Sequence, residues 1–306
     1  MNITTFFKYG TLSLIFLLLT ACVENEKMAA DETPKSFFQL INPNTSEITF
    51  NNQIQEDEKF NMVDFFYVYN GGGVAIGDLN NDDLPDLYFT GNMVEDALYI
   101  NLGELRFKDI TQALPKTQDG WSTGVTLVDV NHDGFLDIYV CRSGNYEKEE
   151  RRNLLYINQG DMTFLERAET FGLADSSHST QAAFFDYDKD GDLDMYLLNH
   201  TNAIRDPNNI KPLISDGSGL ANDRLYRNDE DKGLGIKFTD VTTETGINYD
   251  GLGLGLAIAD INGDGWEDIF FTNDFVANDY IYVNQKDGTF KEMTKSYLNH
   301  VSHFSK

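Results

Sequence analysis

Cysteine is nearly absent from this chain of 306 residues, which contains two, at positions 22 and 141. Cys22 directly follows the N-terminal apolar run, and Cys141 falls within the apolar strand pattern of residues 138–141. We expect no pairing between these thiols, so a disulfide framework is excluded and Cys141 is predicted to be a buried, inert thiol. An exported chain without disulfides needs another means of stabilisation, such as bound metal ions.

Basic residues are the second shortage, because 23 Lys and Arg stand against 50 Asp and Glu and give a formal net charge of −27. Nucleic-acid phosphates are bound mainly through Lys and Arg, so no nucleic-acid partner is expected. Self-repulsion at this charge destabilises a compact fold, and bound cations would offset it. Simple solubility is the alternative explanation of the acidity.

The chain also lacks the motifs of common enzymes. It contains no Gly-x-Ser-x-Gly, no His-Glu-x-x-His and no glycine-rich phosphate loop. Sustained helical periodicity is missing after the first residues, so the expected fold class is all-β. We predict no catalytic residues and no enzymatic activity, although side chains brought together from separate repeats would escape this search.

The N-terminus has the pattern of an export signal. Lys8 precedes an apolar run over residues 12–19 that is too short to span a bilayer. The run ends in Leu-Thr-Ala-Cys, which resembles the lipobox of bacterial lipoproteins. Residues 1–21 are therefore predicted to be a signal peptide, Cys22 a lipidation site and residues 22–36 a polar tether. The expected location is the bacterial envelope, in the outer membrane or at the cell surface, with the lipid as the only membrane contact. An ordinary signal peptide cleaved nearby is the alternative.

One unit recurs four times and decides the expected fold. Each unit has an acidic loop between apolar segments, and the loops begin at Asp78, Asp129, Asp186 and Asp260. An aromatic-rich strand, a turn of Asn, Gly or Asp, and a further strand that begins with Phe follow every loop, and such turns join hairpins. Each unit therefore predicts four strands, and such units in series predict four β-propeller blades over residues 65–298. A β-sandwich would not need the same acidic loop four times.

The segments that flank the repeats are less regular. Residues 37–64 contain a candidate closing strand, Glu47–Phe50, and the third unit carries an insertion, roughly residues 200–221. Residues 299–306 have the place of a fifth blade's first strand. Because open sheet edges invite aggregation, we expect an incomplete ring and a truncated chain. The alternative is a ring of four blades closed by the N-terminal strand.

The acidic loops have the spacing of a calcium site. Alternate residues of a tight loop direct oxygens to one point, and Ca²⁺ takes about six to eight of them. Positions one, three, five and nine carry Asp or Asn, position six is Gly in three loops, and position seven offers a backbone carbonyl. The predicted ligands of up to four Ca²⁺ ions, one per loop, are Asp78, Asn80, Asp82, Leu84, Asp86, Asp129, Asn131, Asp133, Phe135, Asp137, Asp186, Asp188, Asp190, Asp192, Asp194, Asp260, Asn262, Asp264, Trp266 and Asp268.

Other interpretations of these loops fit less well. An EF-hand requires Glu at position twelve, which here is Phe89, Val140, Leu197 or Phe271. Mg²⁺ demands stricter geometry, and zinc prefers other ligands. Asx-turns without metal are the structural alternative, which the fourfold recurrence argues against. We expect the tightest binding in the third loop, which carries the most acid, and strain in the first, where Asp83 holds position six.

The sequence over residues 73–86, followed by Leu-Tyr-Ile-Asn at 98–101, resembles FG-GAP/VCBS repeats, which also build the head of integrin α-subunits. Residues 121–131 and 179–188 are similar to the bacterial branch related to cartilage acidic protein, whose lipoproteins often carry an ASPIC/UnbV domain after the repeats. The resemblance covers residues 65–298 and implies an integrin-α-like β-propeller whose loops bind calcium. No ASPIC/UnbV segment is present, as expected of a truncated chain.

The propeller face opposite the loops is a candidate ligand face. Trp121 and His178 each precede the first Asp of a loop by eight residues, which places them about 25 Å from the loops along an extended strand. The strand connection that carries Arg142, Arg151 and Arg152 should emerge on the same face. We expect this face to bind a glycan or a protein with anionic groups. The alternative is that Trp121 packs in the core and the arginines pair with neighbouring Glu side chains.

Together these patterns predict a calcium-stabilised binding or adhesion module, in which the metal is structural and the partner is an extracellular or envelope protein or glycan. The alternative is a hydrolase or lyase that acts on polysaccharide through the central face of the propeller. That activity would need acid and base groups that converge outside the metal loops. A deep central pocket with carboxylates of perturbed pKa would favour the enzyme.

Overall fold

The computed structural model describes residues 37–201, 214–219, 221–229, 235–274 and 277–298. The chain divides into two units at Asn42 and Pro43, and the second unit contains all the strands. The predicted signal peptide, Cys22, the tether, the fifth-blade segment and most of the predicted insertion lie outside the described residues. Within the ranges above, no helix combines the length and the apolar character needed to cross a membrane.

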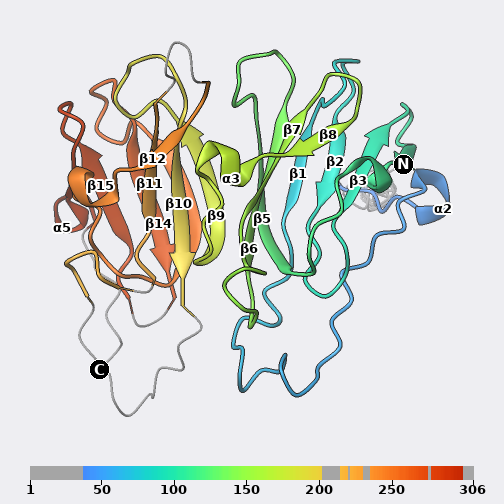
Figure 1. Ribbon diagram of the computed structural model, residues 1–306, viewed down its shortest axis with the longest axis horizontal. Coiled ribbons are helices and arrows are strands. Elements are labelled where there is room, and N and C mark those ends of the chain that lie inside the picture. The colour runs from blue at the N-terminus through green and yellow to red at the C-terminus, as the bar shows by residue number, and fades with distance from the viewer. Residues whose placement is uncertain (1–36, 202–213, 220, 230–234, 275–276, 299–306) are drawn as a thin grey trace, which may run out of the picture. The chain divides into compact units, whose positions relative to one another are not determined.

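Four antiparallel sheets of four strands each form the second unit, and strands pair in chain order within every sheet (Figure 1). The sheets consist of β1 (Val74–Gly77), β2 (Asp86–Phe89), β3 (Ala97–Asn101) and β4 (Phe107–Asp109); β5 (Trp121–Val128), β6 (Asp137–Ser143), β7 (Leu154–Asn158) and β8 (Phe164–Glu166); β9 (His178–Phe185), β10 (Asp194–His200), β11 (Arg224–Asn228) and β12 (Phe238–Asp240); and β13 (Gly253–Ala259), β14 (Asp268–Asn273), β15 (Tyr280–Asn284) and β16 (Phe290–Glu292). This is the architecture of propeller blades, so the predicted all-β fold with four blades is confirmed.

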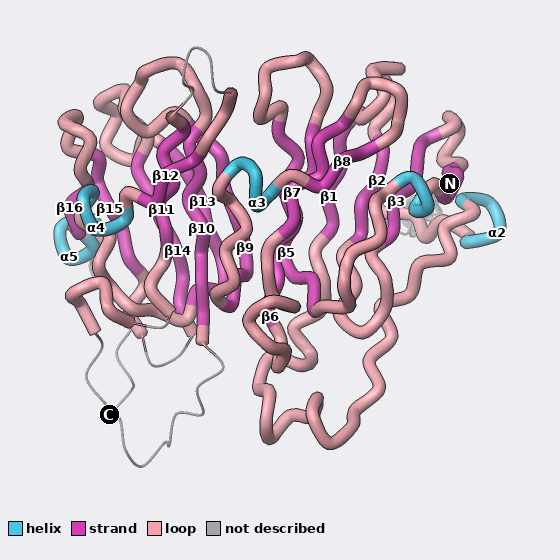
Figure 2. Tube along the Cα trace, viewed as in Figure 1, coloured by secondary structure: helices cyan, strands magenta, loops and turns pink. Residues whose placement is uncertain are grey.

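Short helical turns follow the last strand of each blade (Figure 2). They are η2 (Thr111–Ala113), α3 (Ala168–Phe171), α4 (Thr242–Thr245) and α5 (Thr294–Tyr297). The first residue of three of these turns is a threonine whose hydroxyl accepts a backbone N–H of the third strand, from Leu98, Leu225 and Ile281 respectively. The repeat in the sequence therefore extends to the connection between one blade and the next.

The first strand of each blade lies innermost, because β5 contacts both β1 and β9, and β9 contacts β13. Hydrogen bonds link these inner strands directly. The Gly73 N–H donates to the Thr123 carbonyl at 2.8 Å. The Thr123 hydroxyl donates to the Ser179 carbonyl at 2.8 Å, and the Thr180 hydroxyl to the Gly253 carbonyl at 3.1 Å. The blades are thus joined in series through their inner strands.

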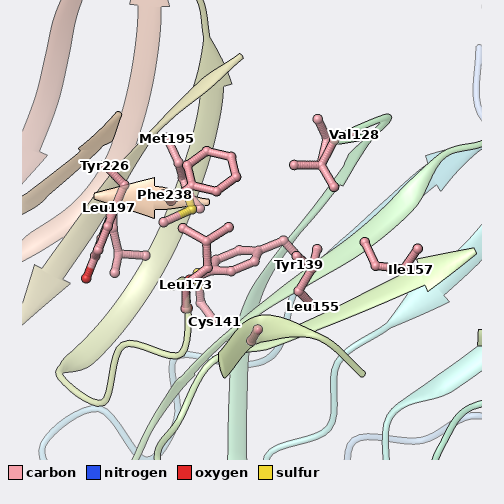
Figure 3. Close-up of a cluster of buried hydrophobic side chains, with 13 residues drawn as sticks. Val128, Tyr139, Cys141, Leu155, Ile157, Leu173, Met195, Leu197, Tyr226 and Phe238 are labelled. Carbon is pink, nitrogen blue, oxygen red and sulfur yellow. The ribbon is translucent and has the colours of Figure 1, made fainter. Parts of the chain in front are cut away.

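Apolar side chains fill the spaces between neighbouring blades. Figure 3 shows the cluster between the second and third blades, where Val128 and Tyr139 lie on one side and Met195, Tyr226 and Phe238 on the other. Equivalent clusters join the first blade to the second and the third blade to the fourth. Because each blade buries its faces against its neighbours, the core is a series of layers.

The strand predicted at Glu47–Phe50 is wrong. The segment follows α2 (Pro43–Ser46) without forming strand hydrogen bonds. Phe50 instead stacks on Phe89 of the first blade, with 5.1 Å between ring centroids, and Ile48 packs in the same cluster. The side chains of Ile48 and Phe50 cover a face of the first blade. Alternating apolar residues suit this packing as well as they suit an edge strand, so the pattern did not distinguish the two.

Candidate metal centre and central face

The acidic loops fold around their own carboxylates. In the third loop, the Asp186 carboxylate accepts the N–H groups of Asp190 and Gly191, at 3.1 and 3.2 Å, and Asp190 accepts the N–H of Asp192 at 3.2 Å. The same bonds from positions five, six and seven recur in the other three loops. Positions one and five are therefore fixed by backbone donors, as in an Asx-turn, and their remaining lone pairs stay available to a cation.

Position nine ties the loop to the third strand of its blade. Asp194 is fully buried, and its two oxygens accept the N–H groups of Tyr187 and Asn228, at 3.1 and 2.9 Å. Asp86, Asp137 and Asp268 are equally buried and make the equivalent pairs of bonds. Burial, together with the nearby acids Asp188 and Asp192, raises the pKa of Asp194 to about 8. A carboxylate in this setting gains stability from a bound cation.

The third loop brings its acids closest together. Oxygens of Asp186, Asp188 and Asp194 all lie within 4.8 Å of one another. Asp192 adds a buried Oδ1 that no protein group satisfies, and burial next to Asp190 and Asp188 raises the pKa of Asp192 to about 6. Hard oxygen ligands, concentrated negative charge and an unsatisfied buried oxygen fit Ca²⁺.

The sequence predicted a backbone carbonyl from Asp192, and its carboxylate is not part of the cluster formed by Asp186, Asp188 and Asp194. The other loops carry Leu84, Phe135 and Trp266 at position seven. Those loops also have Asn at position three. In two of them, its side-chain amide donates to the carboxylate at position five, from Asn80 and Asn131 at 3.0 and 2.8 Å. Within the described ranges, the cluster of three carboxylates is confined to the third loop.

Position six has a left-handed backbone in every loop, with φ of 66° at Asp83, 87° at Gly134, 102° at Gly191 and 86° at Gly265. A residue with a Cβ atom is strained in this region. We expect Asp83→Gly to raise the midpoint of thermal unfolding by about 2–4 °C, equivalent to about 1 kcal/mol. Calorimetry in the presence of a chelator measures this effect without calcium. An unchanged or lower midpoint would show that the Asp83 side chain contributes more than its strain costs.

A lysine side chain contacts the fourth loop, where it would compete with a bound metal ion. Lys286 Nζ lies 3.2 Å from Asp264 Oδ2 at position five. The first two blades have Gly103 and Gly160 at the place of Lys286 in their turns. We expect Lys286→Met to raise calcium affinity at the fourth loop several-fold, because the ion would no longer displace an ammonium group. Terbium luminescence sensitised by Trp266 reports this loop, and unchanged affinity would contradict the prediction.

The residues predicted to form the ligand face contact other residues of the chain. Trp121 is 1% exposed and stacks on Phe60, with 5.3 Å between ring centroids. The buried Arg142 donates to Thr117 Oγ1 at 3.0 Å. Arg152 pairs with Glu169 at 3.1 Å, a more distant acid than the neighbouring glutamates considered from sequence. The described contacts of these two arginines are thus within the chain.

Two histidines form a polar cluster beside the inner strands. His178 begins β9 and pairs in register with His200, at the end of β10. Arg151 Nη1 contacts His178 Nε2 at 2.6 Å, and Ser143 Oγ lies 3.2 Å from His178 Nδ1 and 2.8 Å from His200 Nε2. Sequence spacing identified His178 but missed His200. His200 could have been found from the expected β9–β10 hairpin, in which it pairs with His178.

Arg151 determines which ring nitrogens of His178 and His200 carry a proton. Burial and the Arg151 charge lower the pKa of His178 to about 3, and burial lowers that of His200 to about 4, so both rings are neutral near pH 7. Arg151 can only donate, so His178 Nε2 accepts and its proton lies on Nδ1. His178 then donates to Ser143 Oγ, and the Ser143 hydroxyl donates to Nε2 of His200.

These depressed values predict a loss of stability in acid. The unfolded histidines bind protons near pH 6.5 and the folded ones do not, so stability should fall as the pH drops below about 6.5 towards 4. Each histidine contributes up to about 1.4 kcal/mol per pH unit. Urea titrations at several pH values should show a shallower acid loss for His200→Gln, which keeps an acceptor for Ser143. Parallel curves for the two proteins would contradict this prediction.

The repeated blades with their acidic loops define a propeller-type repeat protein. The sequence profile of the FG-GAP-like repeat matches residues 78–140, 143–197 and 260–304, and the chain belongs to this family. It is also similar to cartilage acidic protein 1 of Xenopus tropicalis, with 27% identity over 210 residues. That match covers 67% of this chain and 29% of the relative, so the chain spans less than a third of the relative's length. The predicted resemblance to FG-GAP repeat propellers is confirmed.

Proposed function

We propose that the chain is a calcium-stabilised, non-enzymatic binding or adhesion module of the bacterial cell envelope. FG-GAP repeats indicate a propeller-type binding or adhesion module. The carboxylate cluster of Asp186, Asp188 and Asp194 carries the calcium part of the proposal. Burial and the neighbouring acids raise the pKa values of Asp188 and Asp194, and a divalent cation would stabilise both carboxylates in their charged form.

The stabilising role follows from the position of the loops. Each loop joins the inner strand of its blade to the second strand, and position nine reaches the third. An ion held by positions one, three and nine would therefore connect three strands of a blade. The four loops contain no Ser, Thr or Cys side chain that could act as a nucleophile, so a structural metal fits better than a catalytic one.

A terbium titration tests calcium binding directly, because Tyr187 and Trp266 lie within the third and fourth loops. We expect saturable luminescence that calcium displaces and magnesium does not, since Mg²⁺ demands stricter geometry. Asp188→Asn should weaken the response, whereas Asp240→Asn, which alters an acid outside the loops, should leave it unchanged. Equal responses from both variants would exclude specific loop binding.

Envelope anchoring rests on the sequence around Cys22 alone. Intact-mass analysis of the protein expressed through its own leader should show an acylated N-terminal Cys22, and Cys22→Ala should release the protein from the membrane fraction. An unmodified mature protein that begins elsewhere would favour an ordinary signal peptide. The partner proposed for the anchored module is an extracellular or envelope protein or glycan.

A further inference from the structure

A cavity of about 490 Å³ lies among the four inner strands. It is lined near the first residues of these strands, by Val74 of β1, Thr123 of β5, Thr180 of β9 and Leu254 of β13. The acidic loops follow the last residues of the same strands, so the cavity and the loops lie at opposite ends. A cavity of this volume can hold a small-molecule ligand.

The cavity is uncharged. None of the described residues that line it is Asp, Glu, Lys or Arg, although the chain has 50 acidic and 23 basic residues. His200 lines it, and burial lowers the pKa of His200 to about 4, so this ring is neutral too. Two charged groups lie next to lining residues or their partners: Arg151 contacts His178, and Asp274 accepts the Tyr67 hydroxyl at 3.2 Å. Neither lines the cavity, so an ionic ligand would lose its hydration here without pairing directly with a charged lining side chain.

Aromatic and polar groups share the lining. Tyr67 supplies the accessible aromatic surface and packs on His200 with 4.6 Å between ring centroids, whereas Phe65 and Trp121 are buried, each 1% exposed. Gln181 also lines the cavity. Its Oε1 accepts the Leu256 N–H at 3.1 Å, which fixes the amide and leaves its NH₂ group as a donor.

We propose that this central cavity binds one uncharged sugar residue of a glycan. A pyranose ring presents apolar C–H groups on its faces, which suit the half-buried Tyr67 ring, and hydroxyl groups around its edge, which suit the side-chain amides of Asn70 and Gln181. This assignment rests on the proposed binding function and names its ligand. It differs from the anionic ligand that the arginines at this end of the propeller suggested from sequence, because Arg142 donates to Thr117, Arg151 contacts His178 and Arg152 pairs with Glu169.

Saturation-transfer NMR with the calcium-loaded full-length protein tests the proposal. The probes are methyl glycosides of glucose, galactose, mannose and N-acetylglucosamine, with glucuronate as the charged counterpart of glucose. We expect at least one neutral glycoside to bind with a dissociation constant on the order of 1 mM, as for a ligand of this size, and glucuronate to bind at least tenfold more weakly.

Two tryptophan substitutions locate the binding. Asn70 is exposed and borders the cavity, so Asn70→Trp should fill it and weaken glycoside binding at least tenfold. Gln112→Trp adds the same side chain on η2, at an exposed position outside the cavity, and should bind like the wild type. Equal binding by both variants, preference for glucuronate, or no binding by any neutral probe would overturn the proposal. If calcium still stabilises the protein in that last case, the calcium-dependent module survives and only the ligand assignment fails.

Discussion

Asp194→Ala should destabilise the protein by about 3 kcal/mol or more even when a chelator has removed all calcium. The reason is that Asp194 is fully buried and accepts two backbone N–H groups, from Tyr187 and Asn228. Each donor left without an acceptor costs about 1–3 kcal/mol. Urea unfolding in a chelator, followed by circular dichroism, measures this loss.

Asp188→Asn is the matched variant in the same loop. Asp188 accepts the Asp190 N–H through Oδ1 at 3.3 Å, and asparagine retains an oxygen for that bond. Its stability in the chelator should therefore stay near that of the wild type, while its stabilisation by calcium decreases. If Asp194→Ala behaved in the same way as Asp188→Asn, position nine would contribute only through the metal, and the structural part of its role would be wrong.

Trp121→Ala should cost about 3–5 kcal/mol, the usual loss for a large buried aromatic side chain. Trp121 stacks on Phe60 and meets Phe65 edge-on, with 5.0 Å between ring centroids. Val68 belongs to the same cluster, so residues 60–68 depend on this side chain for their position. The substitution should also weaken glycoside binding, because Phe65 contacts both Trp121 and Tyr67, the aromatic side chain that is accessible in the cavity.

The second tryptophan provides the control. Trp266 is partly exposed at position seven of the fourth loop and has Lys189 5.0 Å from its ring centroid. Trp266→Ala should cost much less than Trp121→Ala, because it leaves a smaller cavity and an exposed cation contact contributes little. Chelator-treated samples compared by thermal unfolding separate the two. Similar losses would mean that Trp121 is less important to the core than its burial indicates.

The sequence was most informative where one pattern recurs. The acidic loops, the hairpin turns and the four-stranded units could all be predicted, because positions one, five and nine serve the same backbone bonds in every blade. Because the same local geometry is encoded four times, each copy of the pattern supported the prediction made from the others. The identity of the bound ion stays a prediction, since the fit of the third loop is an argument from its oxygens and charge.

Features that occur once were harder to predict. Trp121 looked like an exposed ligand residue because nothing in the repeat indicates that Phe60 and Phe65 cover it. The segment Glu47–Phe50 has the alternation of a strand but covers a blade face. The contact of Ser143 with His178 and His200 joins three strand ends from two blades, and no spacing rule brings such residues together.

Thermal unfolding of the lipid-free protein with calcium and with a chelator tests the central claim most directly. A site that binds only the folded state stabilises it by about 2.7 kcal/mol when calcium exceeds the dissociation constant a hundredfold, and several sites add. We expect a large rise in the unfolding midpoint with calcium, little with magnesium, and a smaller calcium effect in Asp188→Asn. A chelated protein that is folded and whose midpoint calcium does not change would contradict the assignment of these loops as calcium sites.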